Sequence, residues 1–416
     1  MSLAAACSLW RGYEPVNRDA EMERFTSHGG YAPQNYAVSS TRETWSHDGA
    51  LLDVSISIPS APGKRPVVFY LPGMGEGAAN GELWRRQWAQ AGYVVVSMQP
   101  KEYGEASLAN KQGGAGDPGS PGRTAFSEAV LKNNVSQFLW GLGKIADRLR
   151  SGNERYAPLD LSRVALAGYD LGAQTVLRLA AAPKGLPVPS PVSAFRAVIV
   201  MGAPVATFSG KVAGDIRMPL LLVGNGRPDN PAGASAPEKS AWLGLPAGQK
   251  YWLSLERASH RLLSGSMSNG SYWSEVIDVD SSERGGRAAR GRPGYDGVTG
   301  ATSSAGGDWL RATDTAYGSG QTPVEYDALG GASSRGGGRS RNSAPSGGNR
   351  GSQRNTGDRS RQDIESQARA ARQMAIVASV TTAFLDATVQ ASTEAHDWLA
   401  EEASSWLEDY AQWLQR

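Results

Sequence analysis

The stretch from Gly168 to Gly172 places a carboxylate between two glycines, in the order Gly-Tyr-Asp-Leu-Gly. An apolar run, residues 164–167, leads into it, and a helical pattern follows from Thr175. We therefore predict a strand, a sharp turn and a helix, with Asp170 at the tip of the turn. Glycine is required there because a Cβ would not clear the neighbouring strand and helix. We expect the tip to point into the open above the sheet, beside a helix N-terminus whose N–H groups favour negative charge.

A carboxylate at such a tip needs a base and a second acid before it can support covalent catalysis. The chain has four histidines. His260 directly follows an apolar run and is expected at the carboxyl edge of the sheet, where ligands bind. His28 and His47 precede the expected parallel strands, and His396 lies late in the chain. We predict His260 as the base; a structural histidine is the alternative.

Asp229 is the candidate for the second acid. It is the only carboxylate in the loop that follows the apolar run ending at Val223. The loop after Met201 has no carboxylate nearby, and Asp215 precedes its strand and so lies at the wrong end. The alternative for Asp229 is a simple turn residue whose side chain binds the backbone.

The segment Pro72–Gly75 closes another apolar run and is rich in glycine. Backbone N–H groups in such a loop, together with the N–H that follows the elbow residue, can stabilise a developing oxyanion. We predict the N–H groups of Met74 and Leu171 as these donors.

The hydrophobic pattern predicts the elements that would position these residues. Alternation over residues 36–58, with a turn at 47–49, indicates an antiparallel hairpin. Continuous apolar runs between helical patterns indicate buried parallel strands. We predict strands at 65–71, 93–98, 163–168, 196–201, 219–223 and 251–255, with helices at 81–91 and 124–150. The expected fold class is therefore α/β, with a mostly parallel, doubly wound sheet behind an N-terminal hairpin.

The composition changes sharply after this core. Residues 281–362 consist largely of Gly, Ser, Arg, Asn and Thr, which bury too little apolar surface to order a chain. The helical period returns in residues 363–416, first around Ile376 and Phe384 and then in a tryptophan-rich stripe that runs to Leu414. We predict an N-terminal extension (1–35), a core (36–280), a disordered insertion (281–362) and C-terminal helices (363–416), the first completing the core. An amphipathic interaction tail from Glu394 is the alternative for the end of the chain.

Composition and charge indicate which kinds of partner and cofactor the chain can bind. The net charge of +2 indicates no global attraction to nucleic acid, and the single cysteine, Cys7, excludes a disulfide framework and a cysteine-built zinc site. We expect no cofactor and no metal. We also expect no transmembrane segment, since no apolar run reaches about 18 residues. RGG-like segments at 335–339 and 347–351 suit RNA or anionic surfaces, but we favour a solvated linker and no specific nucleic-acid partner. The sequence Ala-Ala-Ala-Cys ending at Cys7 is similar to a lipoprotein cleavage site without its charged and apolar regions; it favours export or the periplasm, with the cytoplasm as the alternative.

Residues 40–265, with the helix near 376–390, resemble the α/β-hydrolase superfamily, and most closely its capless dienelactone-hydrolase and platelet-activating-factor-acetylhydrolase-like branch. The motifs that carry the resemblance are residues 71–75, 168–172, 224–229, 258–260 and 382–387. The resemblance implies hydrolysis of carboxylic esters or thioesters by an elbow serine or cysteine, whereas this chain has Asp170. Haloalkane dehalogenases and epoxide hydrolases carry aspartate there, which attacks a saturated carbon before His and water cleave the ester. Those relatives have a helical cap after the sixth strand, and the short loop between Met201 and Pro219 leaves no room for one.

Three functions remain open. The first is a hydrolase with an Asp170–His260–Asp229 triad that forms a covalent intermediate with an ester or an alkylating small molecule. The second is a hydrolase in which Asp170 is a base for water. The third is a degenerate fold used for binding or scaffolding, with the arginine–glycine insertion as its contact surface. Attack of Asp170 on an ester carbonyl would give a high-energy anhydride, which weakens ordinary esterase action. We favour an enzyme.

Overall fold

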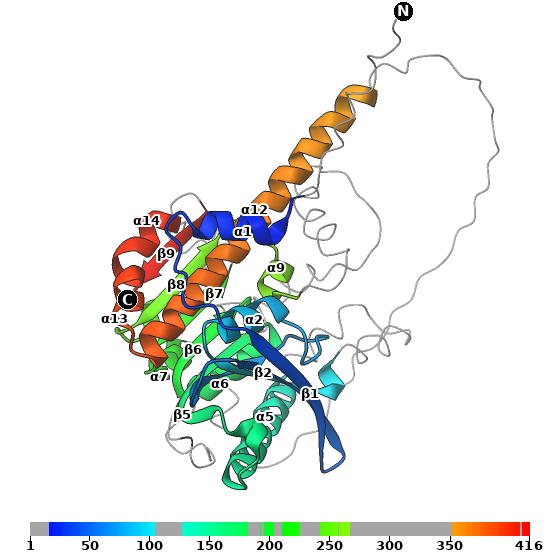
Figure 1. The fold of residues 1–416 in the computed structure, drawn as a ribbon, viewed down its shortest axis with the longest axis vertical. Helices are drawn as coiled ribbons and strands as arrows, with labels where there is room; N and C mark the ends of the chain where they lie inside the picture. Colours follow the sequence, from blue (N-terminus) through cyan, green and yellow to red (C-terminus); the bar gives the residue numbers. More distant parts are fainter. Residues whose placement is uncertain are drawn as a thin grey trace, which may run out of the picture.

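The computed structural model describes residues 16–104, 127–181, 192, 195–203, 210–224, 242–256, 258–266, 352–407 and 410–416, and for 210–212, 260 and 352–360 only the backbone. In this part of the chain, one sheet with the strand order β1-β2-β4-β3-β5-β6-β7-β8-β9 lies between helices on its two faces (Figure 1). The strands are β1 (Val38–His47), β2 (Ala50–Pro59), β3 (Arg65–Leu71), β4 (Val94–Pro100), β5 (Leu159–Tyr169), β6 (Phe195–Met201), β7 (Leu220–Gly224), β8 (Lys250–Leu255) and β9 (Ala411–Gln415).

The first two strands form the predicted hairpin. β1 pairs antiparallel with β2 from Val38 opposite Pro59 to His47 opposite Ala50. Asp48 and Gly49 make the turn with φ of 48° and 82°, the left-handed conformation that an Asp-Gly turn favours. β2 is also antiparallel to β4, whereas the six strands β4, β3, β5, β6, β7 and β8 run parallel to one another. The expected fold class, a mostly parallel α/β sheet behind an antiparallel hairpin, is confirmed.

Helices bury both faces of the parallel strands, which explains their continuous apolar runs. On β3, Val68 and Tyr70 pack toward α2 and α12, and Val67 and Phe69 pack toward α5 and α6. The helices are α1 (Arg18–Thr26), α2 (Glu82–Gln90), η1 (Lys101–Tyr103), α5 (Glu128–Arg150), η2 (Glu154–Tyr156), α6 (Leu171–Ala180), α7 (Gly210–Asp215), α9 (His260–Ser264), α12 (Ser352–Val389), α13 (Thr393–Asp397), η5 (Trp398–Glu402) and α14 (Ala403–Leu407). None of the described helices is long and apolar enough to cross a membrane.

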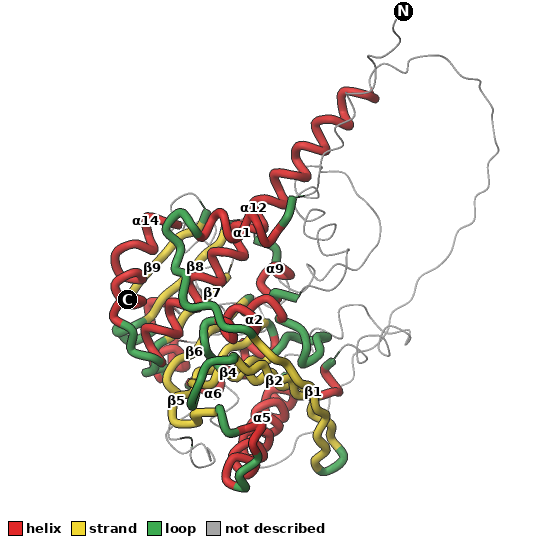
Figure 2. Tube along the Cα trace, viewed as in Figure 1, coloured by secondary structure: helices red, strands yellow, loops and turns green. Residues whose placement is uncertain are grey.

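The long helix α12 begins earlier than expected. It starts at Ser352, inside the segment 281–362 that the composition predicts to be disordered; residues 281–351 lie outside the described part of the chain. Its C-terminal half is buried against the sheet, and its N-terminal half projects away from the body (Figure 2). A helix that is nucleated on a packed end can propagate outward, because each further residue adds one hydrogen bond without needing apolar surface.

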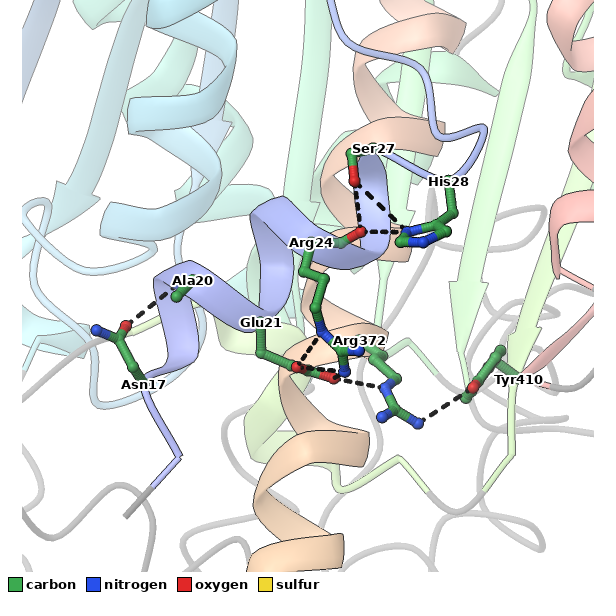
Figure 3. A network of polar contacts seen from close by, with 8 residues as sticks. All are labelled: Asn17, Ala20, Glu21, Arg24, Ser27, His28, Arg372 and Tyr410. Carbon is green, nitrogen blue, oxygen red and sulfur yellow. Dashed lines mark hydrogen bonds and ion pairs between the residues drawn. The ribbon is translucent and has the colours of Figure 1, made fainter. Parts of the chain in front are cut away.

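The N-terminal extension contains α1, which the sequence did not reveal because only Met22 of this helix is fully buried. Glu21 ties α1 to α12: its Oε1 accepts a hydrogen bond from Arg372 Nε at 2.7 Å, and its Oε2 accepts one from Arg24 Nε at 3.0 Å (Figure 3). Arg372 Nη1 also donates to the Tyr410 hydroxyl at 3.1 Å. Glu21 therefore joins α1 to α12, and through Arg372 to Tyr410 just before β9.

The predicted helical stripe through Trp413 and Leu414 is wrong. These residues belong to β9, which pairs antiparallel with β8. Trp413 packs into the core on one side of the sheet and Leu414 into the core on the other, as consecutive residues of a strand do. Trp413 also stacks on Tyr251 with ring centroids 5.2 Å apart. The stretch from Glu394 therefore packs on the body instead of forming a free tail, since Ala395, Leu399 and other side chains of α13 to α14 are buried.

Candidate functional site

Asp170 stands alone between β5 and α6 in a strained conformation. Its φ of 51° and ψ of −113° lie outside the regions that side-chain-bearing residues favour. A Cβ on Gly172 would lie 1.9 Å from the Leu71 carbonyl oxygen, and a Cβ on Gly168 would lie 2.4 Å from the Gly172 carbonyl carbon. The turn is thus as sharp as the sequence predicts, and both flanking glycines are sterically required.

The carboxylate of Asp170 does not project into the open. The residue is only 6% exposed, which corrects the expectation of an open tip. Its side chain makes no capping bond to α6; instead, the Met74 N–H donates to Asp170 Oδ2 at 3.1 Å. The backbone N–H of Asp170 donates to the Met201 carbonyl at 3.1 Å. The side chain therefore turns toward the loop after β3, because one of the predicted oxyanion donors holds it there.

The loop that carries Met74 is fixed by polar side chains. Gln99 Nε2 donates to the Gly73 carbonyl at 3.1 Å and to the Tyr103 carbonyl at 3.2 Å, and the Gly75 N–H donates to the same Tyr103 carbonyl at 2.8 Å. Glu76 Oε2 accepts the Gly73 N–H at 3.0 Å. These contacts fix the backbone on both sides of Met74, and therefore the direction of its N–H.

A buried arginine supports the next part of the loop. Arg85 on α2 is 5% exposed, and its guanidinium donates to the Ser55 hydroxyl at 3.0 Å, to the Asn80 carbonyl at 2.9 Å and to the Ala79 carbonyl. Burial lowers the pKa of Arg85. Gln99, Glu76 and Arg85 were missed in the sequence; only Glu76, a carboxylate inside the glycine-rich loop, gave a visible signal.

His260 is the first residue of α9, directly after β8, as the sequence predicts for its place in the chain. α9 is held by hydrogen bonds from Trp84 Nε1 to the Leu263 carbonyl at 2.9 Å and from the Tyr70 hydroxyl to the Ser264 carbonyl at 3.4 Å. Burial raises the pKa of Tyr70, and the negative charges of Glu76 and Asp170 also raise it, whereas the charge of Arg85 lowers it.

The other predicted triad members have a different status. The side chain of His260 and the whole of Asp229 lie outside the described part of the structure. The convergence of Asp170, His260 and Asp229 therefore stays a prediction. Leu171, the second expected oxyanion donor, opens α6 next to Asp170 and is 1% exposed.

An apolar cluster lies beside the elbow. Tyr103, Leu131 and Leu171 are buried together, and Met74 and Val130 pack against them. Two of these residues, Met74 and Leu171, are the predicted oxyanion donors, so the cluster borders the Asp170 carboxylate. In the described residues, no group of three or more His, Cys, Asp or Glu side chains could hold a metal ion. The elbow therefore holds a fixed carboxylate beside two residues, Met74 and Leu171, that belong to an apolar cluster.

No protein-family model matches the chain, and no curated protein matches it in sequence. Among solved structures, it is similar in fold to a ferulic acid esterase from Streptomyces cinnamoneus, with a TM-score of 0.35 and 15% sequence identity. The match covers 64% of this chain and 94% of the esterase chain. The likeness at this level carries no information on the reaction.

Proposed function

We propose that this protein is a hydrolase in which Asp170 forms a covalent ester with a small alkylating substrate, and in which His260, oriented by Asp229, activates the water that cleaves it. The observation that carries the proposal is the hydrogen bond from the Met74 N–H to Asp170 Oδ2. Asp170 accepts this bond while its backbone is held in a strained conformation. Strain of this kind costs about 1–3 kcal/mol and is concentrated at functional sites.

The first step follows from the orientation of the carboxylate. With Oδ2 held by Met74, Asp170 attacks a saturated carbon through Oδ1. A carbon–oxygen bond forms, and the bond to the leaving group breaks, with the electron pair departing on that group. The product of this step is an ester whose carbonyl oxygen, Oδ2, already lies at a backbone donor.

The second step uses that donor. His260 takes a proton from water, and the hydroxide adds to the Asp170 carboxyl carbon. The negative charge that develops on Oδ2 is stabilised by the N–H groups of Met74 and Leu171, as in an oxyanion hole. The intermediate collapses, the alcohol leaves with Oδ1 and receives the proton from His260, and Asp170 is regenerated with one oxygen from water.

Attack at a carbonyl carbon is less favourable for this residue because it would produce an anhydride. Among esters, those attacked at their alkyl carbon are compatible with the proposed step. Met74 and Val130, the partly buried side chains that pack on the apolar cluster beside the elbow, suit the hydrocarbon part of such a substrate.

The test is to trap the ester. A His260→Gln variant is incubated with 1-bromohexane, 1,2-epoxyhexane and a panel of p-nitrophenyl esters and lactones, and is analysed by intact mass and peptide mapping. The proposal expects an adduct on Asp170 that is absent in an Asp170→Asn/His260→Gln double variant. In ¹⁸O-labelled water, the first turnover of the wild-type enzyme should release product that contains ¹⁶O.

Two results would contradict the proposal. Label in the product of the first turnover would show that Asp170 acts as a base for water. Absence of an adduct and of His260-dependent turnover across the panel would indicate a fold used for binding or scaffolding.

A further inference from the structure

The carboxylate of Glu76 bridges two segments that are far apart in the sequence. Its Oε2 accepts the Gly73 N–H at 3.0 Å, and its Oε1 accepts the Ser266 hydroxyl at 2.8 Å. Ser266 is 8% exposed, and its Oγ also accepts the Gly81 N–H at 3.1 Å. Glu76 therefore fixes its own loop at the Gly73 end and joins it to the segment that follows α9.

We propose that Glu76 is a positioning residue for the reaction: it holds the Met74 N–H on Asp170 and fixes the helix that begins with His260 relative to this donor. The catalytic part of this inference rests on the proposed function. Glu76 acts through the backbone of the loop, since its carboxylate binds the amide of Gly73, the residue directly before Met74.

The loop side of the bridge controls the direction of the Met74 N–H. The Gly73 N–H and the Met74 N–H belong to consecutive peptide planes, which are joined by the two soft torsions of Gly73. A hydrogen bond at the Gly73 N–H fixes the first plane and so restricts the rotation that would turn the Met74 amide away. Glycine at position 73 makes this restraint more important, because its backbone is conformationally permissive. A Cβ at Gly73 would lie 2.8 Å from the Tyr169 ring and 3.1 Å from the Asp170 Cβ, so a larger residue there would displace these two side chains.

The other side of the bridge controls α9. The Ser266 N–H donates to Ser264 Oγ at 3.1 Å, and Ser264 is the last residue of the helix that begins at His260. The Leu83 N–H donates to the Gly265 carbonyl at 3.0 Å, which gives this end of α9 a further anchor on α2. Glu76 thus links the oxyanion donor and the base-bearing helix through a single side chain.

A carboxylate suits this position better than an amide. Both of its oxygens accept, and two of its partners, the Gly73 N–H and the Ser266 hydroxyl, donate to them. Glutamine can keep the bond to Gly73 through its one oxygen, but its amino group then faces the Ser266 hydroxyl, whose proton loses the acceptor that Glu76 Oε1 provides. Alanine loses both bonds. The order of effect is therefore Glu76→Ala above Glu76→Gln.

The first experiment measures the loop without any substrate. Hydrogen–deuterium exchange of peptides covering residues 72–77 is followed in the full chain for wild type, Glu76→Ala and Glu76→Gln. The proposal expects the Gly73 and Met74 amides to exchange about tenfold faster or more in Glu76→Ala, with a smaller increase in Glu76→Gln, because each lost bond lowers the free-energy cost of local opening.

Glu43→Ala, which removes a hydrogen-bonded carboxylate from β1, is the matched control and should leave the exchange of this peptide unchanged. Unchanged exchange of the Met74 amide in Glu76→Ala would overturn the proposal, whatever the activity of the protein.

The second experiment measures the consequence for the chemistry. In the His260→Gln background, the rate of Asp170 alkylation by 1-bromohexane is determined as a function of its concentration. The Met74 N–H orients the attacking carboxylate in this step, and a misplaced nucleophile lowers the rate by about 10- to 100-fold. Glu76→Ala should lower the maximal rate by this factor with an unchanged half-saturating concentration, and Glu76→Gln should recover part of it.

The outcomes separate the two proposals. Equal alkylation rates with and without Glu76→Ala would refute the positioning role. Absence of alkylation in His260→Gln itself would count against the proposed function, while the exchange experiment still decides whether Glu76 orders the donor. If Glu76→Ala does not fold, Ser266→Ala removes one partner of the bridge and should give a smaller effect of the same sign on both measurements.

Discussion

The Met74 N–H lies 3.1 Å from Asp170 Oδ2, so the elbow residue itself occupies one of the two N–H groups that we propose as oxyanion donors. A carboxylate oxygen in this place fits the proposed reaction, in which that oxygen becomes the carbonyl oxygen of an ester. The contact between Asp170 and Met74 therefore agrees with the proposed role of the aspartate.

The backbone strain at Asp170 can be measured. Both Asp170→Ala and Asp170→Gly remove the carboxylate, but only glycine adopts a φ of 51° with a ψ of −113° without a steric penalty. We expect the glycine variant to have a free energy of unfolding about 1 kcal/mol higher than the alanine variant, since the relief of about 1–3 kcal/mol of strain exceeds the entropic cost of glycine. Guanidinium unfolding monitored by tryptophan fluorescence gives this difference.

The control for this prediction is Asp147, an exposed residue within the helix α5. There, glycine should be about 1 kcal/mol less stable than alanine, because helix propensity favours alanine. The same order at both positions, with alanine the more stable, would show that the elbow is not strained.

The close packing of the elbow gives a second prediction. Gly172→Ala would place a Cβ 1.9 Å from the Leu71 carbonyl oxygen, a backbone atom that cannot rotate away. We expect a loss of about 3 kcal/mol or more in the free energy of unfolding, together with loss of Asp170 alkylation. Gly143→Ala on α5, where an added Cβ meets nothing within 4 Å, should gain up to about 1 kcal/mol. Equal effects of the two changes in an unfolding titration would contradict the observed geometry.

The sequence was sufficient for those parts of the fold that have a local or periodic cause. Buried strands such as β3 and β6 show as continuous apolar runs, the hairpin shows as alternation around Asp48 and Gly49, and the elbow shows as Gly168 and Gly172 around one residue. Each of these features depends on residues that are neighbours in the chain. For this reason, the place of Asp170 between a strand and a helix could be predicted.

The sequence was insufficient where the cause is a contact between distant residues. The burial of Asp170 depends on a loop 96 positions away, and the bridge from Glu76 to Ser266 spans 190 positions. β9 was taken for helix because Trp413 and Leu414 fit a helical stripe, whereas the open edge of β8 provides hydrogen bonds that no local pattern reveals. Such contacts depend on the strand order, which the pattern of apolar runs does not contain.

The acid stability of the hairpin gives a third prediction. Burial alone would raise the pKa of Glu43, but hydrogen bonds from Trp45, Arg148 and Arg155 and the charge of Arg148 lower it from 4.5 to about 2. The folded-state pKa lies below the unfolded value, so the stabilisation is complete above pH 4.5 and is lost as the pH falls toward 2.

Glu43→Gln isolates this contribution. Wild type should exceed the variant by only about 1 kcal/mol in the free energy of unfolding at pH 7, because Glu43 and its arginine partners are partly exposed to solvent. This difference should shrink toward zero near pH 2, where Glu43 becomes protonated. Urea unfolding at pH 7, 4 and 2.5 measures the difference. A gap that stays constant with pH would mean that Glu43 contributes by packing and not by its charge.

The buried arginine of α2 gives the last prediction. Arg85 is 5% exposed, and its guanidinium donates to the Ala79 and Asn80 carbonyls and to the Ser55 hydroxyl. Arg85→Met keeps most of the volume but leaves these buried acceptors without their donor, at a cost of about 3 kcal/mol in the free energy of unfolding. Arg85→Lys should recover only part of this loss, since an ammonium group cannot reproduce the planar arrangement of a guanidinium.

Arg86→Met, one residue along the same helix, removes only a 3.9 Å ion pair with Asp19 and should cost less than about 1 kcal/mol. Arg85 supports the loop that leads from Glu76 into α2, so only the Arg85 variants should also increase hydrogen exchange in residues 77–81. Equal exchange in the Arg85 and Arg86 variants would show that Arg85 stabilises the helix alone.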